Sequence, residues 1–352
     1  MKKILVIQNK RIGDVLIASL IATNIKKTIP NSRVDYMVYD YTSGVIENNP
    51  AVDRIIQLNE KKLKKIPTLI KTICEVRQAQ YDIIFDPYAK FQSRVISLFS
   101  KATIRVGYKK TDKNPVLNYY THNVSFLKIK TKPCGKSIED RVHLVNSVFP
   151  LEAPDYTPKI HLTATEKQYS KLKNYNKPVV MFGVLGSTPQ KSMPYEYIIT
   201  LIDYVTTNFD VNILFNYAPN QKLEATKIYN KCKHHDAIIF DVYEASIRGF
   251  ISLMNQCQLL IANEGGVVHI AKALNKPTFT IFSPYVIKSH WASFEDGKLH
   301  TSVHLLDEKP NLFSSSKEER KKIEEDPSFL YNQLTPEIIL KELTPFLKHH
   351  IR

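Results

Sequence analysis

The sequence predicts an α/β protein built from two Rossmann-like halves, and three observations support this prediction. Apolar, β-branched segments alternate with helical segments along the whole chain, a pattern typical of parallel sheets with right-handed helical crossovers. The length of 352 residues fits two domains. Three closely spaced prolines, Pro150, Pro154 and Pro158, mark a linker between the halves. We therefore expect two parallel sheets that face each other across a deep cleft.

The first half contains five predicted strands: ILVIQ, RVDYMVY, RIIQL, YDIIFDP and residues 104–108. Helical segments are predicted over Ala18–Lys27, briefly near Ser43, and over Leu63–Gln78, Phe91–Phe99 and Ser137–Phe149. Between Lys109 and Thr131 the periodicity weakens, so we expect a basic loop there.

The second half repeats this order after a helix predicted over Thr165–Tyr175. Its strands are PVVMFGV, VNILFNY, AIIFDV, LLIANE and TFTIFS. The last segment, LTPEIILKELTPFLKHH, follows a Thr-Pro start and carries apolar residues at helical spacing, which predicts a terminal helix. We expect domains over 1–160 and 161–330, with the helix of 331–352 packing back on the first domain.

Composition narrows the class of protein. Apolar residues make up 43% of the chain, no apolar run reaches the length of a membrane span, and the short apolar start does not resemble a secretion signal. The four cysteines form neither a C-x-x-C pair nor a zinc-ligand pattern, which fits a reducing cytoplasm. The interpretation is a cytoplasmic protein that neither spans a membrane nor is secreted.

The net charge of +15, from 49 Lys and Arg against 34 Asp and Glu, favours anionic partners. No nucleic-acid module accompanies the dispersed lysines, so we expect no nucleic-acid partner. The remaining candidate partners are phosphorylated metabolites and the anionic inner leaflet of a membrane. The many lysines in the first half are typical of a protein in peripheral contact with such a leaflet. Most of these lysines are equally compatible with ordinary solvated surfaces.

Two carboxylates follow predicted strands of the first half. Asp14 stands in the turn between the first strand and the first helix, and Asp86 ends the strand YDIIFDP. Ligands of open α/β sheets gather outside the carboxyl ends of the strands, so both side chains are candidates for a reaction site. The alternative for Asp14 is a structural N-cap of a helix that begins near Val15.

Three loops of the second half also follow predicted strands. The loop GSTPQKS offers Ser187, Thr188 and Lys191 before a helix, an arrangement that favours a bound phosphate. The segment NEGGVVH offers Glu264, Gly265, Gly266 and His269 at the start of the next helix, and Ser283 and Pro284 end the following strand. Lys191 is alternatively a solvated lysine, and His269 a helix residue packed under the loop.

Two common nucleotide-binding signatures are absent from the sequence. Neither G-x-G-x-x-G nor G-x-x-x-x-G-K-[ST] occurs, and the chain has only ten glycines. A dinucleotide-dependent dehydrogenase is therefore poorly supported, and a P-loop enzyme is excluded.

Five spaced motifs resemble glycosyltransferase family 9, the lipopolysaccharide heptosyltransferases. RIGDVL is similar to the family's opening, and YDIIFDPYAKFQSRVISLFSKATIRVGY resembles its next conserved segment. GSTPQKSMPYEYI and NEGGVVHIAKALNKPTFTIFSP match its two later loops, and LTPEIILKEL resembles its closing segment. The sequence departs from the family at Glu264, usually Asp, at Gly265, usually Thr or Ser, at Val267, usually Pro, and at Ser283, usually Gly.

The resemblance implies a GT-B fold, with an acceptor-binding first domain and a nucleotide-sugar-binding second domain. It implies an inverting, metal-independent transfer of a heptose, from a donor expected to be ADP-heptose, to an anionic lipopolysaccharide or lipooligosaccharide core, without a further cofactor. Asp14 would be the general base and Lys191 would meet the charge of the leaving diphosphate. The other expected site residues bind the donor (Gly13, Ser187, Thr188, Glu264, Gly265, Gly266 and His269) or the acceptor (Lys61, Lys64, Asp86 and Arg94).

Two alternatives remain open at this point. One is a glycosyltransferase that uses another nucleotide sugar on a surface glycan or a protein. The other is a non-catalytic binding protein, for which the altered Glu264-Gly265 loop is the main argument.

Overall fold

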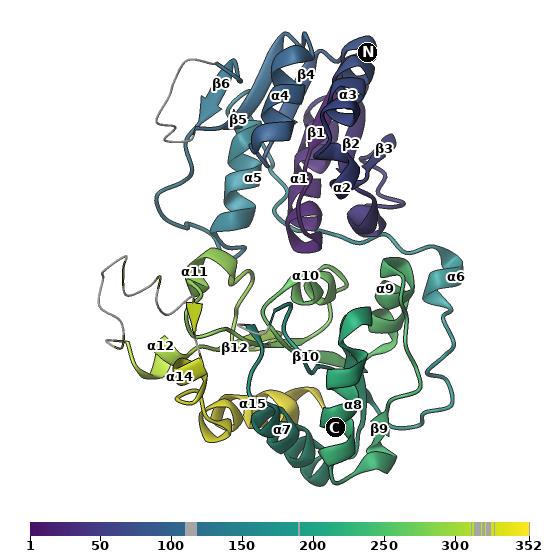
Figure 1. Cartoon of the computed structure of the whole chain (residues 1–352), viewed down its shortest axis with the longest axis vertical. Helices are drawn as coiled ribbons and strands as arrows, with labels where there is room; N and C mark the ends of the chain where they lie inside the picture. The colour runs from purple at the N-terminus through teal and green to yellow at the C-terminus, as the bar shows by residue number, and fades with distance from the viewer. Residues whose placement is uncertain are drawn as a thin grey trace. The chain divides into compact units, whose positions relative to one another are not determined.

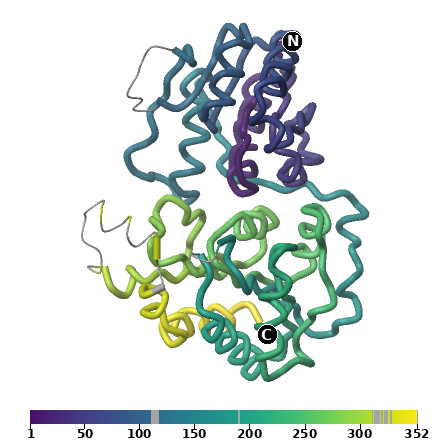
Figure 2. The backbone as a smooth tube through the Cα atoms, in the orientation of Figure 1, coloured from purple at the N-terminus to yellow at the C-terminus, as the bar shows by residue number. Residues whose placement is uncertain are grey.

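The computed structural model describes residues 1–109, 118–188, 191–310, 312, 318, 321, 325–326 and 328–351. The chain forms two compact units, Met1–His161 and Leu162–Arg352, so the division falls one residue after the predicted one. Each unit is built on a six-stranded parallel sheet with helices on its faces (Figure 1). The N-terminus belongs to the first unit and the C-terminus to the second (Figure 2).

The first sheet has the strand order β3-β2-β1-β4-β5-β6. Its strands are β1 (Lys3–Ile7), β2 (Arg33–Tyr39), β3 (Arg54–Leu58), β4 (Ile83–Asp86), β5 (Ile104–Tyr108) and β6 (His122–Val124). The helices are α1 (Ile12–Thr28), η1 (Asp40–Val45), α2 (Glu60–Leu63), α3 (Ile66–Gln78), α4 (Phe91–Phe99) and α5 (Lys136–Asn146). Strand β6 lies in the predicted basic loop, of which residues 110–117 are outside the described residues.

The first sheet is covered by α1 and α5 on one face and by α3 and α4 on the other (Figure 1). Alternate strand residues such as Leu5, Ile7 and Ile84 pack against Val76 of α3 and Ile96 of α4. The strand order reverses between β1 and β4, since β2 follows on one side of β1 and β4 lies on the other. Ligands bind at such a switch point in open α/β sheets.

The second sheet has the order β12-β11-β10-β7-β8-β9, and its switch point lies between β7 and β10. Its strands are β7 (Val179–Gly183), β8 (Asn212–Asn216), β9 (Ile238–Ile239), β10 (Leu259–Asn263), β11 (Thr278–Ile281) and β12 (His300–Val303). The helical segments are α6 (Ala164–Lys167), α7 (Tyr195–Asn208), η3 (Pro219–Gln221), α8 (Lys222–Lys231), η4 (His235–Ala237), α9 (Ile247–Gln256), α10 (Gly266–Ala273), α11 (Lys288–Trp291), α12 (Leu305–Glu308), α14 (Ser328–Tyr331) and α15 (Pro336–His350).

The prediction of a helix over Thr165–Tyr175 is wrong, because the helix in the structure is much shorter. Only the four residues of α6 are α-helical, begun by a capping box between Thr163 and Glu166. Almost all side chains from 164 to 175 are exposed or half-buried, and only Leu172 is buried, so the segment has no apolar face to hold a longer helix.

The terminal helix packs in the second unit, which corrects the expectation that it returns to the first. Its apolar residues Ile339, Leu343, Phe346 and Leu347 are buried in the core of the second unit. The ring of Phe346 lies 5.7 Å from that of Phe279 in β11. The helix runs along β11, β12 and α7, whose apolar side chains would be exposed without it.

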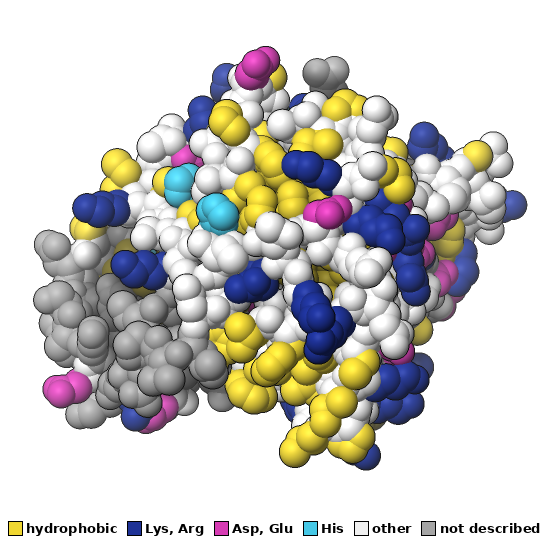
Figure 3. Space-filling view, turned by 90° about the horizontal axis from the view of Figure 1, so that it is seen from above, with side chains coloured by type: hydrophobic (Ala, Val, Ile, Leu, Met, Phe, Trp, Pro, Cys, Tyr) yellow, Lys and Arg dark blue, Asp and Glu magenta, His cyan; other side chains and the backbone are white. Residues whose placement is uncertain are grey.

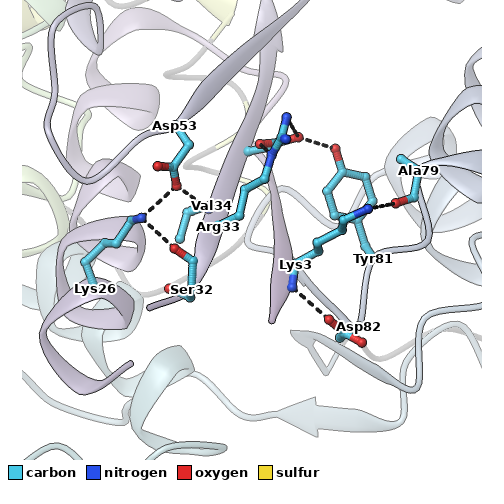
Figure 4. A network of polar contacts seen from close by, with 10 residues as sticks. Lys3, Lys26, Ser32, Arg33, Val34, Asp53, Ala79, Tyr81 and Asp82 are labelled. Carbon is cyan, nitrogen blue, oxygen red and sulfur yellow. Dashed lines mark hydrogen bonds and ion pairs between the residues drawn. The ribbon is translucent and has the colours of Figure 1, made fainter. Parts of the chain in front are cut away.

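A polar network connects the amino ends of β2, β3 and β4 in the sheet of the first unit (Figure 4). Lys26 pairs with Asp53 at 2.7 Å, and Asp53 also accepts a hydrogen bond from the main-chain N–H of Val34. Asp35, nearly fully buried, accepts hydrogen bonds from Tyr81 at 2.6 Å and Arg33 at 3.0 Å. These charges stabilise the sheet at the end opposite to its carboxyl edge.

Candidate active site

The carboxylate of Asp14 lies at the switch point of the first sheet, just after β1. Asp14 is the third residue of α1 and is only 7% exposed. The N-cap is Arg11, whose side chain makes no capping bond, so the alternative of Asp14 as an N-cap is wrong. Its carboxylate instead accepts a hydrogen bond from Lys10 Nζ at 2.7 Å. Gly13 is buried in the same turn.

Arg141 of α5 is a site residue that the sequence analysis missed. Its guanidinium lies 3.8 Å from Asp14 and over the ring of Tyr108 at 5.6 Å from the centroid. Both side chains of the Arg141–Asp14 pair are about nine-tenths buried. Arg141 is 127 positions away from Asp14 in the sequence, and only the packing of α5 against α1 brings the two together.

Two further buried polar residues follow β1. Gln8 and Asn9 have almost no exposed surface, and their side-chain nitrogen and oxygen atoms have no hydrogen-bond partner in the described part of the chain. An unpaired buried polar group costs roughly 1–3 kcal/mol, so such groups usually mark a place for water or a polar ligand. The end of β1 therefore combines a carboxylate, a guanidinium and two unpaired amides.

Asp86 does not fit the predicted role in acceptor binding, because its side chain has no exposed surface. It accepts hydrogen bonds from Tyr120 Oη at 2.6 Å and from the main-chain N–H of Ala89 at 2.8 Å. Burial raises the pKa of Asp86 to about 6, against the opposing effect of these hydrogen bonds. The carboxylate of Asp86 thus holds the turn after β4 in place and binds the hydroxyl of Tyr120.

The other acceptor candidates occupy the surface of the first unit. Lys61 in α2 and Lys64 at its C-cap are exposed, and Lys64 pairs with Glu60 at 3.3 Å. Arg94 on α4 is half-buried, with its guanidinium 5.3 Å from the centre of the Tyr119 ring. The chemistry of these cations suits an anionic ligand.

In the second unit, Lys191 and Glu264 form an ion pair at the switch point. Lys191 follows β7, Glu264 follows β10, and Nζ lies 3.0 Å from Oε1. The second carboxylate oxygen of Glu264 accepts a hydrogen bond from the main-chain N–H of Ser283 at 2.8 Å. Asn263 donates to the carbonyl of Lys191 at 2.7 Å. The buried Glu264 carboxylate therefore ties together the loops that follow three neighbouring strands.

The loop that carries Lys191 is closed by its own hydrogen bonds. Ser192 Oγ accepts from the N–H of Gly186 at 2.9 Å and donates to the carbonyl of Thr188, which also receives the N–H of Lys191. A Cβ on Gly186 would lie 2.1 Å from the carbonyl oxygen of Lys191, so only glycine fits this close approach. Ser187 is exposed and Thr188 half-buried. Residues 189 and 190 are outside the described residues.

Helix α10 begins two residues after Glu264. Gly265 is its N-cap, in an extended conformation, and a Cβ placed on Gly265 meets nothing within 4 Å. Gly266 is the first helical residue, and His269, half-buried, is the fourth. The first N–H groups of a helix have no partner within it and favour an anion. Lys191 is ion-paired with Glu264, the residue before the N-cap of α10, so its ammonium group offers hydrogen-bond donors there while the pair as a whole is neutral.

Other features of the described residues bear on the kind of site. All four cysteines are free thiols, and Cys74 is exposed. Within the described ranges, no three His, Cys, Asp or Glu side chains gather as metal ligands. None of the helices in those ranges is long and apolar enough to cross a membrane.

Comparison with known proteins identifies the class. The family described as glycosyltransferase family 9 (heptosyltransferase) matches residues 69–321. The lipopolysaccharide heptosyltransferase 1 of Campylobacter coli is 24% identical over 297 residues, which cover 80% of this chain and 83% of the relative. The lipooligosaccharide heptosyltransferase 2 of Haemophilus ducreyi is 21% identical over 78% of this chain and 81% of its own.

Solved structures share the fold over the whole chain. The glycosyl transferase family 9 structure from Veillonella parvula has a TM-score of 0.81 at 16% identity, covering 99% of this chain and 97% of the other. The ADP complex of the E. coli heptosyltransferase WaaC has a TM-score of 0.71 at 15% identity, covering 97% and 99%.

The two parallel sheets, together with these matches, define a glycosyltransferase of the GT-B fold. Within this class, the chain belongs to glycosyltransferase family 9, as its motifs predict.

Proposed function

We propose that this enzyme transfers a heptose, or a related sugar, with inversion from a nucleotide diphosphate donor to an anionic lipopolysaccharide or lipooligosaccharide core. The observation that carries the proposal is the Lys191–Glu264 pair beside the start of α10. ADP-heptose is the proposed donor, since both relatives compared above are named heptosyltransferases and an E. coli heptosyltransferase of similar fold was solved with ADP-2-deoxy-2-fluoro heptose.

The donor diphosphate would bind at α10. Its oxygens would accept hydrogen bonds from the first N–H groups of the helix, near Gly265 and Gly266, and Lys191 Nζ would neutralise the charge that develops on the leaving phosphate. The hydroxyls of Ser187 and Thr188 and the imidazole of His269 are proposed as further donor contacts. In this proposal a lysine and a helix terminus supply the charge stabilisation, without a metal ion or other cofactor.

Asp14 would be the general base. The acceptor hydroxyl oxygen attacks the anomeric carbon, its proton passes to Asp14, and the bond between that carbon and the diphosphate oxygen breaks on the opposite face. A carboxylate suffices because the alcohol proton becomes acidic as the new bond forms, and alignment of the reactants supplies much of the rate. Lys10 and Arg141 would hold the carboxylate in position.

The proposed acceptor is anionic, for example a phosphorylated or Kdo-bearing lipid core. Lys61, Lys64 and Arg94 are the proposed cations for it; Asp86 is left out because it is fully buried. A lipid-linked acceptor and the net charge of +15 also support a location in the cytoplasm, in peripheral contact with the inner face of the cytoplasmic membrane.

The test is a calorimetric and thermal-shift screen of the purified protein against ADP, GDP, UDP, dTDP, CMP and ADP-heptose. The proposal requires that ADP stabilise the protein selectively and that ADP-heptose bind more tightly than ADP. Preference for another nucleotide would change the donor and keep the assignment of Asp14. Failure of every nucleotide to bind would favour the non-catalytic alternative, with Gly265 in place of a hydroxyl-bearing residue as its structural basis.

A further inference from the structure

Helices α3 and α4 expose apolar side chains to solvent. Ile66 and Ile70 on α3 are 72% and 55% exposed, and Phe91 and Phe99 on α4 are 65% and 51% exposed. These four residues are called here the α3–α4 surface. A single exposed apolar residue needs no explanation, but large ones gathered on neighbouring helices usually mark an interaction site.

Helix geometry places the four side chains on the outer side of both helices. Ile66 and Ile70 are four positions apart, and Phe91 and Phe99 are eight apart, so each pair lies on one face of its helix. The inner faces are separate: Val76 of α3 and Ile96 of α4 are buried against the sheet. Helices α3 and α4 pack side by side (Figure 1), so the two exposed pairs belong to adjoining helices.

Positive charge surrounds this surface. Residues 60–101 contain nine Lys and Arg and four Asp and Glu, and one of these acids, Asp86, has no exposed surface. Five of the lysines precede or follow Ile66 within five residues and are exposed: Lys61, Lys62, Lys64, Lys65 and Lys71. On the face shown in Figure 3, hydrophobic side chains gather with Lys and Arg side chains beside them.

We propose that the α3–α4 surface and its lysines dock this enzyme on an anionic lipid bilayer. Apolar side chains rimmed by lysines fit the boundary between headgroups and acyl chains, where apolar burial and attraction to anionic headgroups add. The excess of cations favours a lipid surface over a second copy of the chain, since two such faces would repel each other. The proposal deepens the proposed function, because it names the surface that brings the enzyme to a lipid-linked acceptor.

The experiment is co-sedimentation with vesicles of phosphatidylcholine alone, or of phosphatidylcholine with an equal share of phosphatidylglycerol. The wild type is compared with a quadruple variant that carries Ile66→Ser, Ile70→Ser, Phe91→Ser and Phe99→Ser. Leu223→Ser is the matched control, because Leu223 is 76% exposed on α8 of the second unit. A charge variant replaces Lys62, Lys65 and Lys71 by Gln.

The wild type and Leu223→Ser should bind the anionic vesicles, more strongly at low salt than at high salt. The quadruple variant should bind at least about tenfold more weakly, since it loses the apolar insertion, and the charge variant should lose most of the salt dependence. Unchanged melting temperatures and unchanged ADP binding would show that both units remain folded.

Equal binding of the quadruple variant and the wild type would overturn the proposal. The proposal would also be overturned if sedimentation equilibrium showed a dimeric wild type and a monomeric quadruple variant, because the α3–α4 surface would then bind a second copy of the chain. Vesicle binding is measured without donor or acceptor. If the protein binds ADP but the quadruple variant binds vesicles as well as the wild type does, only the docking proposal fails. If the protein does not bind ADP but vesicle binding depends on the α3–α4 surface, only the proposed transfer reaction fails.

Discussion

Replacing Asp14 by Asn should abolish transfer and leave nucleotide binding intact. The variant keeps the shape of the side chain but removes the proton acceptor, and loss of a general base lowers rates by roughly 10²–10⁴-fold. Donor affinity should change little, since every expected donor contact except the main chain of Gly13 comes from the second unit. The assay is transfer from ADP-heptose under saturating donor, with ADP affinity measured separately by calorimetry.

The structure also predicts the effect of this substitution on stability. Lys10 is 39% exposed, so its 2.7 Å pair with Asp14 contributes at most about 1 kcal/mol. The 3.8 Å pair with Arg141 is buried, and its gross attraction of roughly 4 kcal/mol at an effective dielectric of about 20 is largely offset by desolvation. Because Asp14→Asn leaves the buried guanidinium of Arg141 without its partner, a loss of about 3–5 kcal/mol follows, or roughly 6–20 °C in melting temperature for a unit of this size.

Asp35→Asn is the matched control for this prediction. Asp35 is a buried carboxylate of the same unit, held by Arg33 and Tyr81 at the amino end of the sheet. Its replacement should lower the melting temperature by a similar amount and leave transfer per folded molecule unchanged. If Asp14→Asn transferred sugar at the wild-type rate, or if Asp35→Asn lost activity to the same extent, Asp14 would not be the base.

Three further predictions concern the second unit. Lys191→Ala should weaken ADP binding about tenfold or more in calorimetry and also slow transfer, because it removes the cation at the proposed diphosphate site; unchanged affinity would exclude Lys191 from that site. Gly265→Thr should fold normally and change stability by no more than a few tenths of a kcal/mol, since its Cβ meets open space at an extended N-cap; we expect ADP affinity in calorimetry to be equal or higher, and loss of folding would contradict the described geometry. Burial lowers the pKa of His300 to about 4, from 6.5. Between pH 6.5 and pH 4 the imidazole of His300 therefore binds a proton in the unfolded chain but not in the folded one. The contribution of His300 to the free energy of unfolding is complete above pH 6.5 and is lost as the pH falls toward 4. Urea unfolding at pH 7 and pH 5 should show this loss, and His300→Asn should reduce it; an equal loss in the variant would assign the effect to other groups.

The local patterns in the sequence were sufficient for most of the fold. The apolar runs RIIQL and 104–108 are strands with the predicted bounds, and Phe91–Phe99 is a helix with the predicted bounds. The pattern failed where apolar residues are few. Strands β6 and β12 are short and partly polar, and they are recognised only by their pairing with β5 and β11.

By itself, the sequence determined the α/β class, the two-unit organisation, the family and the positions of Asp14, Lys191 and Glu264 after strands, because these depend on periodicity and on motifs contiguous in the chain. Only the tertiary structure decided what those side chains contact. It brought Arg141 to Asp14 through the packing of α5 on α1, and joined Lys191 to Glu264 across 73 positions. It also buried Asp86, and placed α15 on β11 and β12. Long-range packing and desolvation are properties of the assembled core, and a local sequence pattern carries little information about them.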